Sequence, residues 1–495
     1  RRKKRYSNML KQVVKGIILV SAAGAAVAAA MKMKQNSDDE QKRAAAPIDS
    51  ENHVHTEYGD IEGVDEGSHI EYRGIPYAKA PINDLRWKAP QRMDRWGGTL
   101  QADEFSAREP QSFIDEQQKQ PVAEGQINYH KEFYSDPSYE RRDSEDCLYL
   151  NVYVPKNAAG RKLPVAFWIH GGAFNHGHGS EIAFDGESYA EKGVILVTIN
   201  YRVGIFGFFA HPWLTSEDEH HSSGNYGILD QLAALQWVKE NIAAFGGDPE
   251  NITIFGQSAG AMSVQTIIES DLNEHIPAKA IMQSGCGISS DLTLAKAEEY
   301  GELFVRLTGA ASLEALRALS TEELMSYVPE YLKQMNERGS MLCWQPVIDG
   351  YVLKEGSSEL LKAGKFLDIP YMVGTTKNDI TTTKDSIEHH LPSPLDTAAL
   401  SFSTNLEELG RKPAYLYRFE RDLPGDSCGA WHSSELWYMF GSLRKCWRKF
   451  EQHDYHLSEE MVSYWTNFMK NGDPNGSGLP EWKPSSKEEP VHILK

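Results

Sequence analysis

The chain has 495 residues, of which 40% are hydrophobic and 24% charged, a composition typical of a soluble globular protein and not of a disordered one. Its net charge is −19. Residues 1–43 hold eleven Lys/Arg and three Asp/Glu (+8), which leaves −27 (−19 − 8) for the rest. Because a body so acidic repels phosphate groups, we expect neither nucleic acid nor an anionic lipid surface to bind it. The five cysteines have no CxxC or metal-ligand spacing, which favours buried thiols without a disulfide framework.

Residues 1–47 have the pattern of a signal peptide or membrane anchor followed by a linker. A basic cluster at Arg1–Arg5 precedes an uncharged apolar run, Gly16–Met31, which is short for a membrane span and suits a secretory signal. The small residues Ala28–Ala30 fit a cleavage site. We therefore expect a secreted or cell-surface protein in preference to a cytoplasmic one. An uncleaved tether or amphipathic tail is the alternative, so membrane attachment through this segment stays open. Residues 48–495 are predicted to form one catalytic domain.

Within residues 48–495, short β-branched and aromatic runs alternate with segments of helical period. Apolar residues between 229 and 242 mark such a helix, and residues 104–143, which lack periodicity, predict a surface loop bordering the active site. The alternation predicts an α/β fold: a mostly parallel central sheet with helices on both faces. The predicted strands are His69–Tyr77, Glu145–Tyr153, Pro164–His170, Gly193–Tyr201, Ile252–Phe255, Ala280–Gly285, Pro370–Thr375 and Pro413–Phe419.

The most informative stretch is residues 251–265, NITIFGQSAGAMSVQ. Gly256-Gln257-Ser258-Ala259-Gly260 separates a buried strand from a helix, and this is the context of a nucleophile elbow. The glycines leave room for the sharp turn, so that the serine stands exposed at the end of the strand. The N-terminus of the following helix favours developing negative charge. We interpret Ser258 as a nucleophile.

A second Gly-x-Ser-x-Gly occurs at residues 425–429, around Ser427. It follows Pro424 and lacks a strand before it and a helix after it. A polar turn is therefore the favoured interpretation of this segment.

A glycine pair follows the strand Pro164–His170 directly. An acyl-transfer enzyme needs preorganised N–H donors for the oxyanion of its tetrahedral intermediate. We assign this role to the backbone N–H groups of Gly171, Gly172 and Ala259, the last being the residue after the nucleophile. Taken alone, His-Gly-Gly is an ordinary glycine loop; the elbow some ninety residues later makes the catalytic interpretation the favoured one.

A serine nucleophile needs a base and a carboxylate that orients the base, and both lie beyond the ends of later strands. His432 is the predicted base. Asp379 is the predicted acid, with Asp385 and Glu388 as alternatives.

Two groups of histidines, His176 with His178 and the pair in residues 218–221, lack metal-ligand spacing and are predicted to be solvated loop residues. We therefore expect no metal and no cofactor.

Five long motifs in this order resemble the type-B carboxylesterases, which include bacterial para-nitrobenzyl-esterase-like enzymes and the cholinesterases. They are EDCLYLNVY, HGGAF, NYGILDQLAALQWVKENIAAFGGDP, GQSAG and GAWHSSELWYMFG, and the similarity runs from Tyr58 to Trp482. The resemblance implies an α/β-hydrolase fold and hydrolysis of small-molecule carboxylic esters without a cofactor. It also implies roles for Ser258, His432 and the three oxyanion residues. The helix-rich segment between 286 and 369 is expected to form an insertion over the active site.

Three positions depart from the family pattern. Asp379 stands where the family commonly has Glu. The cysteine that usually pairs with the one in EDCL is absent, and Glu109 takes its place, so Cys147 is expected to be unpaired. Gln257 replaces the Glu that precedes the nucleophile in cholinesterases, which argues against a choline-ester specialist because a cationic substrate loses one nearby carboxylate.

The predicted function is that of a serine hydrolase that cleaves carboxylic esters through a Ser-His-Asp triad and an acyl-enzyme. Two alternatives are weighed against it. A non-catalytic, cholinesterase-like binding or adhesion module would keep the fold and lose the serine, which this chain retains. A lipase or amidase would use the same triad on a different bond, and the pocket decides between these substrates.

Overall fold

The computed structural model describes residues 51–111, 122–123, 125–288, 291–340, 342–380, 382–389, 391–486 and 491–495. The chain divides into two compact units, Arg1–His55, which contains β1 (His53–His55), and Thr56–Lys495. The expected signal or anchor in residues 1–47 lies outside the described residues. Among the described residues, no helix combines the length and hydrophobicity that crossing a membrane requires.

A ten-stranded sheet runs through the second unit in the order β13-β12-β11-β10-β9-β7-β8-β6-β4-β3. From β13 to β8 the neighbouring strands are parallel, whereas β6, β4 and β3 continue the sheet antiparallel. A separate pair, β2 (Asp60–Glu62) and β5 (Thr99–Gln101), is parallel. The mostly parallel sheet predicted from the sequence is confirmed. The strands of the large sheet are β3 (Val64–Asp65), β4 (His69–Pro76), β6 (Tyr149–Pro155), β7 (Leu163–Ile169), β8 (Ile195–Ile199), β9 (Gly247–Gln257), β10 (Pro277–Gln283), β11 (Tyr371–Thr376), β12 (Tyr415–Phe419) and β13 (His492–Leu494).

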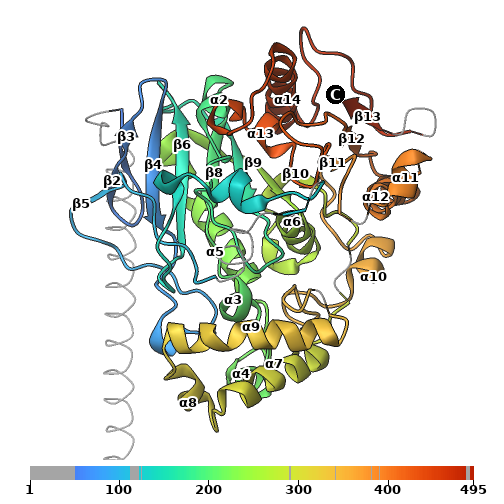
Figure 1. Cartoon of the computed structure of the whole chain (residues 1–495). Coiled ribbons are helices and arrows are strands. Elements are labelled where there is room, and N and C mark those ends of the chain that lie inside the picture. The colour runs from blue at the N-terminus through green and yellow to red at the C-terminus, as the bar shows by residue number, and fades with distance from the viewer. Residues whose placement is uncertain are drawn as a thin grey trace, which may run out of the picture. The chain divides into compact units, whose positions relative to one another are not determined.

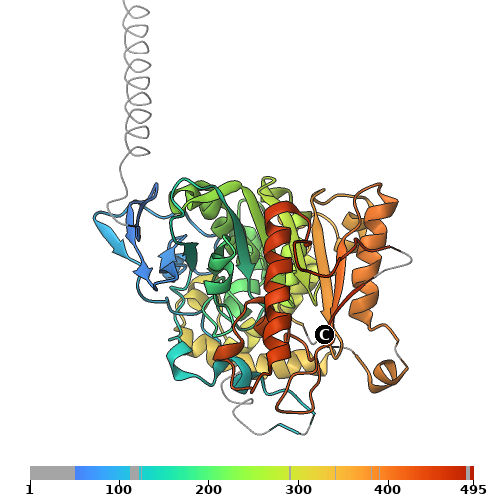
Figure 2. The same ribbon diagram turned by 90° about the horizontal axis from the view of Figure 1, so that it is seen from above.

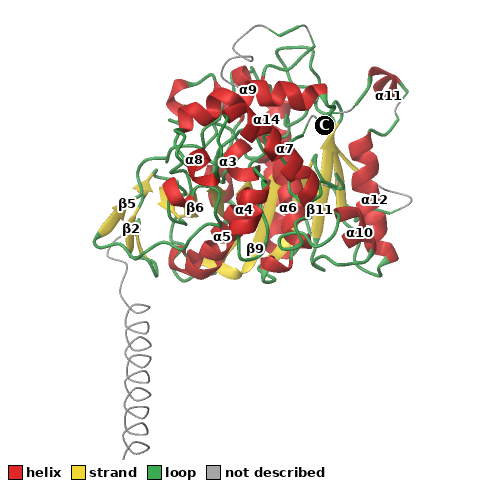
Figure 3. Cartoon of the chain, turned by 90° about the horizontal axis from the view of Figure 1, so that it is seen from below, coloured by secondary structure: helices red, strands yellow, loops and turns green. Residues whose placement is uncertain are grey.

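Helices cover both faces of this sheet, which explains why its central strands are hydrophobic runs without alternation. Every residue of β8 and of β11 is buried. On one face lie α2 (Glu187–Glu191), α13 (Leu436–Met439) and α14 (Gln452–Asn471), with α14 in front of the strands in Figure 2. On the other lie α5 (Tyr226–Asn241) and α6 (Ala259–Glu269), which face the viewer in Figure 3.

The remaining helices are short or belong to the inserted segment, apart from α12, which lies between β11 and β12 in the sequence. The predicted insertion contains α7, α8 and α9, which gather beside α3 and α4 in Figure 1. A Ser320–Glu323 capping box starts helix α9, and the apolar face of this helix continues past Pro329. The bounds are α3 (Gly204–Phe208), α4 (Pro212–Glu217), α7 (Leu294–Thr308), α8 (Leu313–Arg317), α9 (Thr321–Glu337), α10 (Ser357–Lys362), α11 (Lys384–Glu388) and α12 (Pro394–Glu408), with short turns η1 (Asn83–Leu85), η2 (His130–Tyr134), η3 (Pro137–Tyr139), η4 (Ile242–Phe245), η5 (Asp271–Asn273) and η6 (Leu443–Lys445).

All five cysteines are free thiols, as expected. The buried Cys147 donates a hydrogen bond of 2.6 Å from Sγ to Oε2 of the buried Glu109, the residue that takes the place of the family's second cysteine. Burial raises the pKa of the Glu109 carboxyl and of the Cys147 thiol well above their usual ranges. A neutral thiol–carboxyl contact therefore stands where the family resemblance implies a disulfide in related chains.

A buried ion pair joins the end of β8 to α5. Arg202 Nε and Nη2 each lie 2.7 Å from an Asp230 carboxylate oxygen, and the two side chains are 2% and 0% exposed. Replacing Asp230 by alanine leaves a buried guanidinium without its counter-ion. We expect the free energy of unfolding to fall by about 3–5 kcal/mol, measured by urea denaturation. The control, Glu299→Ala, removes an exposed partner of Lys296 and should change stability by less than about 0.5 kcal/mol; equal effects would contradict the prediction.

Candidate active site

Ser258 stands between the end of β9 and the start of α6 in an unfavourable backbone conformation, with φ 57° and ψ −124°. The neighbouring glycines make this turn sterically feasible. A Cβ on Gly260 would lie 2.1 Å from the carbonyl oxygen of Ile169 on β7, and one on Gly256 would lie 2.5 Å from the backbone of Gly260. The structure thus has the strained strand–turn–helix that the motif predicts.

The predicted base and acid meet on loops that follow neighbouring strands. His432 Nδ1 lies 2.5 Å from Asp379 Oδ1. The carboxylate also accepts hydrogen bonds from the Ser284 hydroxyl (2.6 Å) and from two backbone N–H groups, those of residues 376 and 380. Of the alternatives, Asp385 is exposed on α11 and pairs with His389, and Glu388 is exposed on the same helix. Asp379 is therefore the acid that the fold brings to His432.

Burial and charge act against each other on this pair. Burial raises the pKa of Asp379, but the neighbouring His432 and the hydrogen bonds outweigh it and hold that pKa below its usual value. Burial likewise lowers the pKa of His432, and the Asp379 carboxylate more than compensates, so the net shift is upward. An ionised Asp379 accepts a hydrogen bond from Nδ1–H, which leaves Nε2 of the neutral ring as a hydrogen-bond acceptor.

Ser258 and His432 open onto one cavity of about 270 Å³. The side-chain amide of Gln257 lies 3.2 Å from His432 Nε2, whereas the Ser258 hydroxyl makes no hydrogen bond to another described residue. The inserted segment contributes two residues to the lining, as expected of a helical insertion over the site. The lining consists of Tyr129, Phe133, Tyr134, Gly171, Gly172, Ala173, His176, Glu181, Phe184, Gln257, Ser258, Ala259, Met262, Ile288, Leu342, Ile380, His432, Ser433 and Leu436.

The predicted oxyanion residues border the same cavity. A Cβ on Gly171 would lie 2.7 Å from the carbonyl oxygen of Gln257 and 3.2 Å from the Cβ of Ser258, so glycine lets this loop pass close to the serine. Gly172 has a φ of +105°, and Ala259 provides the first backbone N–H of α6. Ala173 lines the cavity beside them with a φ of 53° and is a further candidate donor that the sequence analysis did not assign.

One expectation about this loop is wrong. His178 was expected to be solvated, but it is 2% exposed, its Nδ1 lies 3.1 Å from the Ser180 hydroxyl, and burial holds its pKa well below the usual value. The reason is that the glycine-rich loop folds inward: a Cβ on Gly177 would lie 2.5 Å from the His170 ring. His176 lines the cavity. Within the described ranges, no group of three or more His, Cys, Asp or Glu is arranged to hold a metal ion.

Sequence reasoning missed a second carboxyl near the pair. Glu435 is fully buried, and burial together with the charge of Asp379 raises its pKa to about 7. Gln283 donates a 3.2 Å hydrogen bond to its Oε1. Ser284, which bonds to Asp379, was missed as well. Their only signal in the sequence was position: Glu435 follows the candidate base by three residues, and Ser284 is the last residue but one of a predicted strand.

The contact between Gln257 and His432 predicts a pH effect. In Gln257→Glu, a carboxylate beside Nε2 would stabilise the imidazolium and raise the pKa of His432. Because only the neutral ring can accept a proton, the acid limb of kcat/KM against pH should move up by about one unit. The control is Gln452→Glu at the exposed start of α14, which adds the same charge far from the site and should leave the limb in place. If the acid limb of Gln257→Glu stayed at the wild-type pH, the result would contradict the contact between residue 257 and His432.

Comparison with known proteins identifies the family of the chain. The model of the carboxylesterase family matches residues 50–408 and 395–495. The chain is 33% identical over 486 residues to the para-nitrobenzyl esterase of Bacillus subtilis (strain 168), a match that covers 89% of this chain and 94% of the relative. It is also 33% identical over 477 residues to the fumonisin B1 esterase of Sphingopyxis macrogoltabida, with 86% and 83% covered.

Solved structures give the same result. A thermophilic PNB esterase has a TM-score of 0.76 and 30% identity, and the carboxylesterase EST55 of Geobacillus stearothermophilus has 0.72 and 32%. Each superposition covers 90% of this chain and 96% of the other. The chain therefore belongs to the carboxylesterase family: it has an α/β-hydrolase fold and is a carboxylic ester hydrolase.

Proposed function

We propose that this enzyme hydrolyses small-molecule carboxylic esters in two steps through an acyl-enzyme on Ser258. His432 takes the proton of the Ser258 hydroxyl as the oxygen attacks the ester carbonyl, and Asp379 keeps the imidazole in the required tautomer. The N–H groups of Gly171, Gly172 and Ala259 hold the oxyanion. His432 then gives its proton to the departing alcohol, and water deacylates the serine by the same route.

The observation that carries the proposal is the His432–Asp379 contact of 2.5 Å beside a cavity that Ser258 also lines. In the structure Nε2 faces the Gln257 amide, so the attack requires Nε2 to exchange this partner for the Ser258 hydroxyl. Catalytic hydrogen bonds of this kind often form only when substrate is bound.

The cavity favours short and medium acyl chains. Its volume of about 270 Å³ is small, and much of its lining is apolar, from Phe133, Phe184, Met262 and Leu436 among others. We expect kcat/KM for para-nitrophenyl esters to rise from acetate to butyrate and to fall at octanoate, with an initial burst of nitrophenol equal to one acyl group per protein.

A fluorophosphonate should label the peptide that contains Ser258, identified by mass spectrometry. Absence of turnover by folded protein would favour the binding-module alternative, and activity that increases on long-chain emulsions would favour a lipase. Labelling of a different serine would contradict the assignment of the nucleophile.

A further inference from the structure

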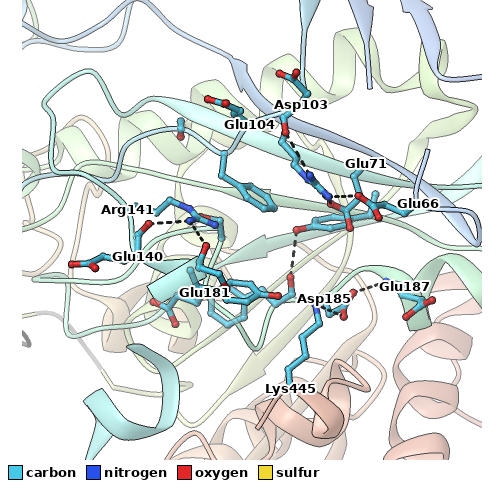
Figure 4. Close-up of a pocket in the computed structure, with 18 of the residues that line it drawn as sticks. Glu66, Glu71, Asp103, Glu104, Glu140, Arg141, Glu181, Asp185, Glu187 and Lys445 are labelled. Atoms are coloured by element: carbon cyan, nitrogen blue, oxygen red, sulfur yellow. Dashed lines mark hydrogen bonds and ion pairs between the residues drawn. The ribbon is translucent and has the colours of Figure 1, made fainter. Parts of the chain in front are cut away.

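A second and larger cavity, of about 780 Å³, lies beside the catalytic one and is strongly acidic (Figure 4). Its lining includes eight Asp/Glu and four Lys/Arg, so its field favours positively charged groups. These residues are Glu66, Glu71, Asp103, Glu104, Glu140, Glu181, Asp185 and Glu187, with Arg73, Arg141, Arg142 and Lys445.

Two residues, Glu181 and Phe184, line both cavities and so form a wall between them. Glu181 is the only Asp or Glu among the described residues that line the catalytic cavity. It is 7% exposed, and its Oε1 accepts hydrogen bonds from the Tyr134 hydroxyl (2.6 Å) and the His178 backbone N–H (3.2 Å). Its Oε2 has no hydrogen-bond partner among the described residues.

Because Glu181 lines both cavities, a carboxylate oxygen without a protein partner is open there to a cation or a hydrogen-bond donor of a ligand. The surroundings of Glu181 suit a cation. The aromatic rings of Phe133, Tyr134 and Phe184 line the same cavity as Glu181 and can contribute cation–π attraction. The neutral Gln257 provides no carboxylate next to the nucleophile. Glu181 provides one in the wall of the cavity instead.

We propose that Glu181 is a specificity-determining residue that gives the enzyme a preference for carboxylic esters carrying an ammonium group, whose charged end meets the Glu181 carboxylate at the wall of the acidic cavity. This inference rests on the proposed ester hydrolysis. It names the residue that binds the charged group of the substrate, a group that the triad and the oxyanion loop do not contact.

The preference has a pH dependence of defined sign. Burial raises the pKa of Glu181 to about 7, against the opposing effects of the Tyr134 hydroxyl, the His178 N–H and Arg108. The other titratable groups around it are the buried Tyr201 and His178 rings, and Arg141, which bonds to the adjacent Ser180. Glu181 is therefore anionic above about pH 7, where an ammonium group gains the contact, and the gain is lost as the pH falls below that value.

The test compares esters that differ only by NH₃⁺ in place of CH₃. One pair carries the group on the acyl chain (para-nitrophenyl 6-aminohexanoate and heptanoate), and the other on the alcohol (6-aminohexyl and heptyl butyrate). The readout is the kcat/KM ratio of charged to neutral ester. We expect a ratio of about ten or more at pH 8 in one of the pairs, since hydrogen bonds to charged groups are worth this much. In Glu181→Gln the ratio should fall to about one.

The control is Glu337→Gln, an exposed residue at the end of α9 that removes the same charge and should keep the wild-type ratio. A wild-type ratio of one in both pairs, or an unchanged ratio in Glu181→Gln, would overturn the inference. Should the variant fail to fold, the unmodified enzyme still decides: the ratio must fall between pH 8 and pH 6, and a constant ratio would be evidence against Glu181. If the enzyme did not hydrolyse the neutral esters at all, the result would contradict the proposed ester hydrolysis, and therefore also this inference.

Discussion

Replacing Ser258 by alanine is expected to lower kcat for para-nitrophenyl butyrate by at least about a thousandfold, to the residual level that an oxyanion loop and substrate binding alone support. The reason is that alanine removes the oxygen that forms the acyl-enzyme, while the elbow, the cavity and the His432–Asp379 contact remain. Steady-state turnover and the nitrophenol burst measure the loss, and the burst should vanish altogether. Circular dichroism should be unchanged, because a hydroxyl without a hydrogen bond to another described residue contributes little to stability.

The chain offers a matched control for this experiment in Ser427. It has the same Gly-x-Ser-x-Gly surroundings but lies exposed in a bend beside the ion-paired Asp426, away from the described lining of the catalytic cavity. Ser427→Ala should keep wild-type turnover and burst. Loss of activity in this variant, or retention of it in Ser258→Ala, would contradict the assignment of the nucleophile.

The parts of the site that were predictable from sequence are those that a short stretch specifies by itself. The sharp turn at Ser258 requires the glycines that flank this serine in the sequence. The loop at Gly171 likewise has no room for a Cβ where it approaches the serine. The strands could also be located, because a sheet covered on both faces produces hydrophobic runs such as β8 and β11. Strand order then brings the loop ends together, which is why His432 and Asp379 could be proposed as partners.

The contacts that sequence could not provide join residues far apart in the chain. Nothing in Gln257 indicates that its amide lies against His432, 175 positions later, or in Ser284 that its hydroxyl bonds to Asp379. The burial of His178 could not be predicted from the sequence either. The polar, glycine-rich composition around it suggests a solvated loop, and only the packing of this loop against β7 and β8 shows that it is buried. Glu181 belongs to this class, since its importance comes from the two cavities that it separates.

Asp379→Asn is the second change with a large expected effect, and it separates orientation of the base from loss of the nucleophile. Asparagine keeps the shape of the side chain but presents one acceptor oxygen where the carboxylate now receives hydrogen bonds from Ser284, from two backbone N–H groups and from His432. An amide N–H directed at Nδ1 would favour the imidazole tautomer whose protonated Nε2 cannot accept the serine proton. We expect kcat to fall by about a thousandfold to ten-thousandfold, with fluorophosphonate labelling slowed in proportion.

The pH profile gives this prediction a signature that a merely destabilised protein would lack. The Asp379 carboxylate raises the pKa of His432, so its removal should lower that pKa. The acid limb of the residual activity in Asp379→Asn should therefore lie at lower pH than in the wild type, the opposite direction to Gln257→Glu. Asp385→Asn, which neutralises an exposed carboxylate six residues later, should retain full activity and the original limb. If Asp385→Asn were the inactive variant, or if the limb of Asp379→Asn did not move, the orienting acid would have to be sought elsewhere, with the buried Glu435 beside His432 as the first alternative.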